Sequence, residues 1–98
     1  MPTDLFALAD QVHDEESFLG FVAALAADWQ EEHEIEKSNP SSPYAPGALS
    51  WENGTVGAVL DAAVRWGEAS IKGLQFYEKP VNHWRRAAQI LHAGKFYE

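Results

Sequence analysis

The sequence has 98 residues, 46% of them hydrophobic, and a formal net charge of -8. This length suits one domain with its own core and is too short for two. Because the chain has no cysteine, a disulfide framework, a thiolate metal site and a cysteine nucleophile are excluded. We therefore expect residues 1–98 to form a single domain that folds on its own.

The start of the chain, MPTDLFALADQV, has neither the basic segment nor the long apolar segment of a secretion signal. The longest apolar-rich run, residues 18–27, is too short to span a bilayer. We predict a cytoplasmic protein that does not bind membranes.

Charge is distributed unevenly along the chain. Residues 1–36 hold ten Asp and Glu and no Lys or Arg, whereas residues 37–98 hold five acids and all seven bases. A domain with this net charge is repelled by phosphate backbones and by anionic lipid. We predict no nucleic-acid binding, and a protein partner that is basic.

The N-terminal third predicts a short helix within residues 3–12 and a long helix over residues 15–37. Asp14 is a suitable N-cap for the long helix, and two acids follow it where the helix dipole favours them. One side of this helix carries four small residues, Gly20, Ala23, Ala24 and Ala27. We expect that side to be covered, either by the N-terminal segment or by the same helix of a second chain in a homodimer.

Residues 38–54 hold three prolines and four serines, which prevents regular structure over most of their length. We predict a long Pro/Ser-rich loop. Tyr44 and Trp51 are aromatic residues within it, and they suggest that parts of the loop are anchored. Loops of this length are commonly functional or mobile.

Two further helices are predicted over residues 56–72, after the N-cap Thr55, and over residues 82–94, after Asn82. We therefore predict an all-α fold, a small bundle of three principal helices with a short N-terminal helix. The apolar stripes of the helices predict these core residues: Phe18, Val22, Leu25, Trp29, Val59, Leu60, Ala63, Ile71, Trp84, Ala88 and Leu91. On this interpretation Leu60→Asp places a charge in the core and severely destabilises the fold.

Three stretches resemble a family of small bacterial proteins: FLGFVAALAADW (18–29), WENGTVGAVLDAAVRW (51–66) and WRRAAQILHAGKFYE (84–98). That family has a Phe-Leu-x-Phe helix start, a Trp-x-Asn-x-Thr turn into a second helix that ends in Trp, and a closing Trp-Arg helix that finishes in Tyr-Glu. The resemblance implies a shared fold and lends no chemistry, since the family has no established activity. Its members are also similar to immunity-type proteins in size and acidity.

No motif in the sequence specifies a catalytic or metal site. The histidines, at positions 13, 33, 83 and 92, lack the spacing of metal ligands, and no glycine-rich phosphate loop occurs. We predict no catalytic residue, no metal and no cofactor.

The end of the first long helix carries a cluster of acids: Asp28, Glu31, Glu32, Glu34 and Glu36. Acids at a helix C-terminus oppose the macrodipole, at a cost of roughly 0.3 to 1 kcal/mol each when exposed. Three interpretations stay open: the cluster binds a basic partner, it is neutralised by Lys37, Arg85 and Arg86, or it maintains solubility.

The segment Trp51–Thr55 joins the loop to the next helix. We interpret Trp51 as an aromatic anchor that packs near Val59 or Leu60, and Asn53 or Thr55 as a cap for free amides at the helix start. An anion bound at this helix start is the functional alternative.

From these features we predict a non-enzymatic protein-binding module, of the inhibitor or immunity type, that engages a basic partner. The predicted binding residues are Asp28, Glu31, Glu32, Glu34, Glu36, Tyr44 and Trp51. Two alternatives stay open: a small metal-dependent or hydrolytic enzyme, and a structural domain that acts by oligomerising.

Overall fold

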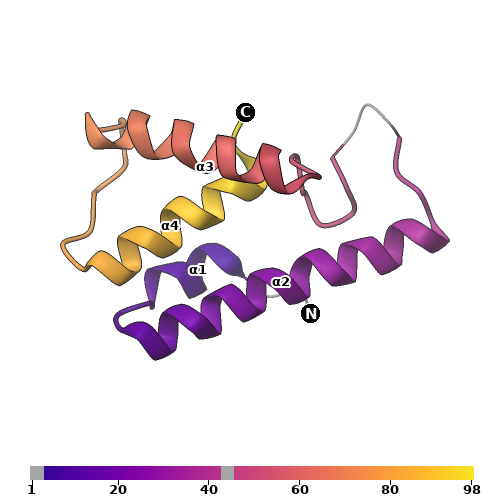
Figure 1. Ribbon diagram of the computed structural model, residues 1–98, viewed down its shortest axis with the longest axis horizontal. Coiled ribbons are helices and arrows are strands. Elements are labelled where there is room, and N and C mark those ends of the chain that lie inside the picture. The colour runs from indigo at the N-terminus through magenta and orange to yellow at the C-terminus, as the bar shows by residue number, and fades with distance from the viewer. Residues whose placement is uncertain (1–3, 43–45) are drawn as a thin grey trace.

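The computed structural model describes residues 4–42 and 46–98 and is all-helical, as predicted (Figure 1). Its helices are α1 (Leu5–Asp10), α2 (Glu15–Ser38), α3 (Val56–Ile71) and α4 (His83–Phe96). No strand occurs within the described ranges. In this part of the chain, none of the helices has both the length and the apolar character needed to cross a membrane.

Each helix begins at a polar side chain that accepts a hydrogen bond from a free backbone amide of the first turn. The caps are Asp4, Asp14, Thr55 and Asn82. At α2 the capping is reciprocal: Asp14 accepts from the Ser17 amide at 2.8 Å, and the Ser17 hydroxyl accepts from the Asp14 amide at 3.0 Å. These local contacts fix the helix starts independently of tertiary packing.

Helix α4 is the centre of the arrangement, because it contacts α1, α2 and α3. Figure 1 shows it between α3 on one side and α1 and α2 on the other. Over the described residues α2 makes no helix contact with α3, and the C-terminal part of α2 extends past α4. The molecule is therefore elongated, with principal extents of 42 × 27 × 23 Å.

The buried core lies where α1, α2 and α4 meet. Phe21 is fully buried, and Leu5, Ala9, Val12 and Leu25 surround it. Trp51 joins this cluster from the loop before α3. The short N-terminal helix is thus an integral part of the core rather than an appendage.

Three residues predicted to be buried are exposed: Leu60 by 57%, Ile71 by 64% and Trp84 by 40%. Helix α3 packs on α4 with small residues instead, namely Ala62, Ala63, Gly67 and Ser70. Small side chains allow a close helix crossing, and the larger apolar residues of α3 are then left outside. The prediction for Leu60→Asp was therefore wrong in its premise, and we now expect that variant to fold.

The small residues on the other side of α2 are mostly open. Ala24 packs against the core, whereas Gly20, Ala23 and Ala27 are exposed in the single chain. Covering of that side by a second chain stays a prediction.

Candidate functional site

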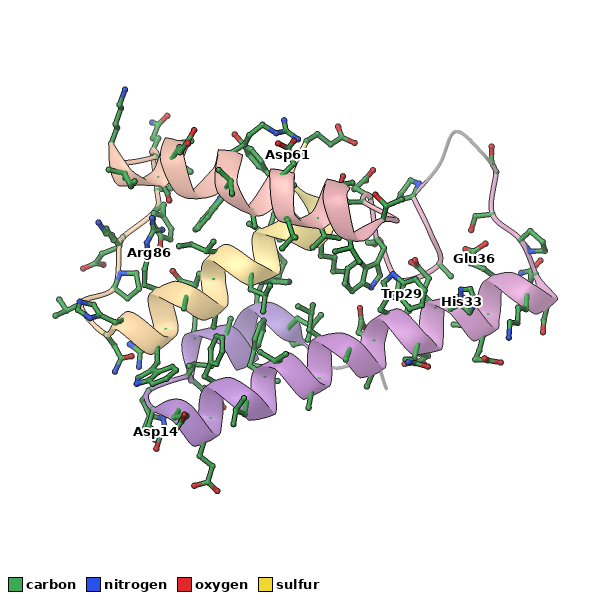
Figure 2. All side chains as sticks on the ribbon, in the orientation of Figure 1. Asp14, Trp29, His33, Glu36, Asp61 and Arg86 are labelled. Atoms are coloured by element: carbon green, nitrogen blue, oxygen red, sulfur yellow. The ribbon has the colours of Figure 1, made fainter. Side chains whose placement is uncertain are left out.

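Three of the predicted binding residues, Asp28, Glu32 and Glu36, are spaced four residues apart and lie along one face of α2. That face looks toward the loop between α2 and α3, and Figure 2 shows Glu36 on this side of the helix. We call these residues the inner carboxylates. All three accept hydrogen bonds from the loop, so the loop is bound along just over two turns of α2.

Glu32 is 9% exposed and holds the backbone of the loop. Its Oε1 accepts from the amide of Leu49 at 2.8 Å and from the amide of Trp51 at 3.2 Å. The loop approaches so closely that a Cβ at Gly47 would overlap the Glu32 carboxylate. Any other residue at position 47 would require the Glu32 carboxylate to shift, and this buried carboxylate is bound by amides rather than by a base.

Glu36 binds both ends of the segment between Ser41 and Ala48. It accepts from the amide and the hydroxyl of Ser41, each at 2.6 Å, and from the amide of Ala48 at 2.9 Å. The hydrogen bonds from Ser41 hold the pKa of Glu36 below its ordinary value of 4.5. The charged form is thus the form that the loop recognises.

Asp28 connects α2 to the loop and to α4. Its Oδ2 accepts from the indole Nε1 of Trp51 at 2.9 Å and from Nζ of Lys95 at 2.8 Å. The Asp28 and Lys95 side chains are only 7% and 11% exposed, and the Lys95 ammonium lies 5.5 Å from the Trp51 ring centroid. Sequence reasoning missed Lys95, which lies 67 positions from Asp28 and carries no local signal of this pairing.

The two remaining acids of the cluster, Glu31 and Glu34, are exposed and lie on another side of α2. Glu34 is 3.4 Å from Nζ of Lys37, its neighbour one turn on. Arg85 and Arg86 do not neutralise the cluster, because Arg85 binds the carbonyl of Val12 and Arg86 binds Ser70 and Tyr77. Tyr44 lies outside the described residues.

The exposed side of α2 combines acids with small residues. It comprises Glu16, Gly20, Ala23, Ala27, Glu31 and Glu34. We call this set the outer acidic face. The predicted acidic cluster thus has two parts. The inner carboxylates bind groups of the same chain, whereas Glu31 and Glu34 are exposed to solvent.

The segment before α3 acts partly as predicted. Thr55 caps α3 through a hydrogen bond from the Ala58 amide at 3.1 Å. Asn53, however, caps the far end of α4: its Nδ2 donates to the carbonyls of Gly94 at 2.9 Å and Tyr97 at 3.1 Å. The sequence left open whether Asn53 or Thr55 caps the start of α3, and in the structure Thr55 is the cap.

An apolar groove of about 380 Å³ lies where the loop enters α3, facing α2. Its walls are Trp29, Trp51, Gly54, Thr55, Val56, Val59 and Leu60. On α2 the ring of His33 stacks on that of Trp29 with centroids 4.9 Å apart. The groove exists because α2 and α3 diverge here without helix contacts.

A second hollow, of about 390 Å³, is lined by Lys95, Asp28, Asp4, Ser50 and His92 among others. His92 is 4% exposed and is surrounded by the rings of Phe6, Phe21 and Phe96. Burial, with a contribution from the Lys95 charge, lowers the pKa of His92 to about 4. Its imidazole is therefore neutral at pH 7 and acts as an aromatic member of the core.

Among the described residues, no three His, Asp or Glu side chains are grouped in a way that could hold a metal ion. Comparison with models of protein families, with curated proteins and with solved structures finds no match to this chain.

Proposed function

We propose that this protein is a non-enzymatic binding module whose outer acidic face takes a basic protein partner. The observation that carries the proposal is the separation of the acids on α2. The inner carboxylates are used by the loop and by Lys95. The outer acids Glu16, Glu31 and Glu34 stay exposed, and Lys37 is their one ion-pair partner in the described ranges.

The surroundings of this face strengthen its negative potential. Asp14 and Glu15, at the start of α2, are also exposed. No Lys or Arg occurs in the first 36 residues. An excess of like charge attracts a basic partner over distances near the Debye length and raises its association rate.

The small residues of the same face determine what shape of partner fits. Gly20, Ala23 and Ala27 leave a shallow track along α2 between the acids at its two ends. A helix can approach such a track closely, and its Lys or Arg side chains can reach the acids on either end. A basic helix is therefore the partner that we favour, as in an inhibitor or immunity protein that covers a basic surface of its target.

Two double variants with the same change in net charge test this proposal. Glu31→Gln with Glu34→Gln alters the outer face, and Glu32→Gln with Glu36→Gln alters the inner carboxylates. A partner is first captured with the wild-type protein and then purified. Its association and dissociation rates are measured against each variant at several ionic strengths, and each variant is also melted.

The outer variant is expected to keep or slightly raise its melting temperature, because it loses repulsion and an unfavourable position on the helix dipole. It should bind the partner more slowly, and the wild-type association rate should fall as salt rises. The inner variant is expected to melt lower and, where folded, to associate like the wild type. Equal association rates for the outer variant and the wild type would refute the proposal.

A further inference from the structure

A small hollow of about 150 Å³ lies among α1, α3, α4 and the connector that precedes α4. Five of the residues that line it carry aromatic rings: Phe6, Trp66, Tyr77, His92 and Phe96. We call it the aromatic hollow. Sites for drug-sized ligands have volumes of about 300 to 1,000 Å³, so this one suits a single small group of a ligand.

The rings of the aromatic hollow form two groups. Phe6, His92 and Phe96 are in mutual contact, with centroids 4.5, 5.1 and 5.4 Å apart. Trp66 and Tyr77 meet edge to face, at 5.1 Å and 75°. The hollow therefore has aromatic walls from α1 and α4 and from α3 and the connector. Rings that surround a small space in this way attract organic cations, because the π face of a ring carries negative charge.

The charge inside the aromatic hollow is negative. Asp10 is the one acid or base among the described residues that line it, apart from His92, whose pKa of about 4 makes it neutral at pH 7. Asp10 has no ion-pair partner in residues 4–42 and 46–98, and its Oδ1 accepts from Nε2 of Gln89 at 3.1 Å. Asp10 and Phe6 are both exposed, so the carboxylate lies where a ligand would enter.

The other polar groups of the lining are already bonded to one another. Nη1 of Arg86 donates to the Tyr77 hydroxyl at 3.2 Å, the hydroxyl donates to Oε1 of Gln89, and Gln89 donates to Asp10. The Arg86 guanidinium lies 5.4 Å from the Trp66 ring centroid but does not line the hollow. Its charge opposes a second cation, whereas Asp10, within the hollow, is the charge that a ligand contacts directly.

This arrangement favours a methylated ammonium over an unmethylated one. A primary ammonium has three N–H donors, each of which needs an acceptor once it leaves water. With the Tyr77 and Gln89 oxygens engaged, the hollow offers few acceptors and a large aromatic surface. A trimethylammonium group carries the same positive charge without any N–H donor, and its methyl groups can contact the rings.

We propose that the aromatic hollow binds a trimethylammonium group, with the rings around its methyl groups and the Asp10 carboxylate beside its charge. The site involves α1, α3 and α4, whereas the outer acidic face lies on α2. The proposal therefore goes beyond the binding of a basic partner and does not depend on it.

Isothermal titration of the purified protein with choline tests the site. The comparison compound is the neutral carbon analogue of choline, in which a tert-butyl group replaces the trimethylammonium group. Choline is expected to bind saturably at one molecule per chain, and the analogue at least about tenfold more weakly, because it keeps the shape and loses the charge. Absence of saturable binding up to about 10 mM choline, or equal binding of the two compounds, would overturn the proposal.

Two variants locate the binding. Phe6→Leu removes a ring and Asp10→Asn removes the charge, and both positions are exposed, so the melting temperatures should stay near that of the wild type. Each variant is expected to bind choline about tenfold more weakly. Glu31→Gln is the matched control, since it removes one negative charge from the outer acidic face and should leave choline binding unchanged. Equal affinities of Asp10→Asn and Glu31→Gln for choline would exclude the aromatic hollow as the site.

Peptides distinguish the two sources of a trimethylammonium group. A peptide that contains trimethyl-lysine is titrated beside the same peptide with unmodified lysine. Tighter binding of the methylated peptide than of choline would identify a methylated protein as the ligand, and the reverse order would identify a small molecule. The proposal would be wrong if the unmodified peptide bound as tightly as the methylated one.

Discussion

Gly94→Ala tests the close crossing of α3 and α4. This crossing leaves the larger apolar residues of α3, such as Leu60 and Ile71, exposed. A Cβ at position 94 would lie 2.6 Å from the carbonyl oxygen of Val59 and 2.8 Å from its Cγ1. The carbonyl belongs to the backbone of α3 and cannot rotate away, so the helices must separate. Overpacking of this kind costs about 1 to 3 kcal/mol, and the better helix propensity of alanine offsets up to about 1 kcal/mol of it. We expect a net loss of about 1 to 2 kcal/mol, which lowers the melting temperature by about 4 to 16 °C for a domain of this size.

Gly20→Ala is the matched control, since it makes the same substitution at an exposed position inside α2. No heavy atom lies within 4 Å of the added Cβ. The control should therefore gain about 0.5 to 1 kcal/mol from helix propensity alone. Thermal and urea unfolding followed by circular dichroism measure both variants. A Gly94→Ala protein as stable as Gly20→Ala would show that the close crossing at Val59 is wrong.

Three further predictions concern the buried polar groups. His92 has a pKa of about 4 in the folded protein and 6.5 ordinarily, so the unfolded chain binds more protons between these values, and stability falls as the pH drops from about 6.5 toward 4. The shift corresponds to about 3 kcal/mol at most. Urea titrations at pH 7 and 4.5 should show most of this loss in the wild type and less of it in His92→Phe. Trp51→Phe removes the indole donor to Asp28 and should lower the unfolding free energy by about 1.5 to 3 kcal/mol, and unchanged chemical denaturation would contradict the bond. Asn53→Ala frees two carbonyls at the end of α4 and should accelerate hydrogen exchange of the Tyr97 amide, while protection at Phe21 in the core changes little.

The sequence was sufficient to place the helices, because their signals are local. Asp14, Thr55 and Asn82 were recognised as caps, and each accepts the expected backbone amide. Burial was less predictable, because helical periodicity marks an apolar stripe without saying what covers it. In α3 the stripe containing Leu60 and Ile71 is uncovered, and the buried side is formed by residues too small to stand out in such a pattern.

The acidic cluster shows the same limit for the candidate site. Composition and helix position identified Asp28, Glu32 and Glu36 together with Glu31 and Glu34, but could not separate them. The distinction depends on where the loop lies, which is a tertiary property. One local signal was available: the inner carboxylates share a spacing of four residues, and they precede a proline-rich loop whose amides have no helix or strand to bind.

The way in which Glu36 holds its loop bears on how this chain can change in length. Its carboxylate binds Ser41 and Ala48, so one side chain fixes both ends of the short segment between them. Residues added inside that segment would leave these hydrogen bonds in place, and the entropy of closing a longer loop rises only slowly with its length. An insertion between Ser41 and Pro46 should therefore be tolerated far better than one between Leu49 and Trp51, where two amides must reach Glu32 together. The first segment is accordingly the natural place in this domain for an epitope, a fluorophore or a protease site.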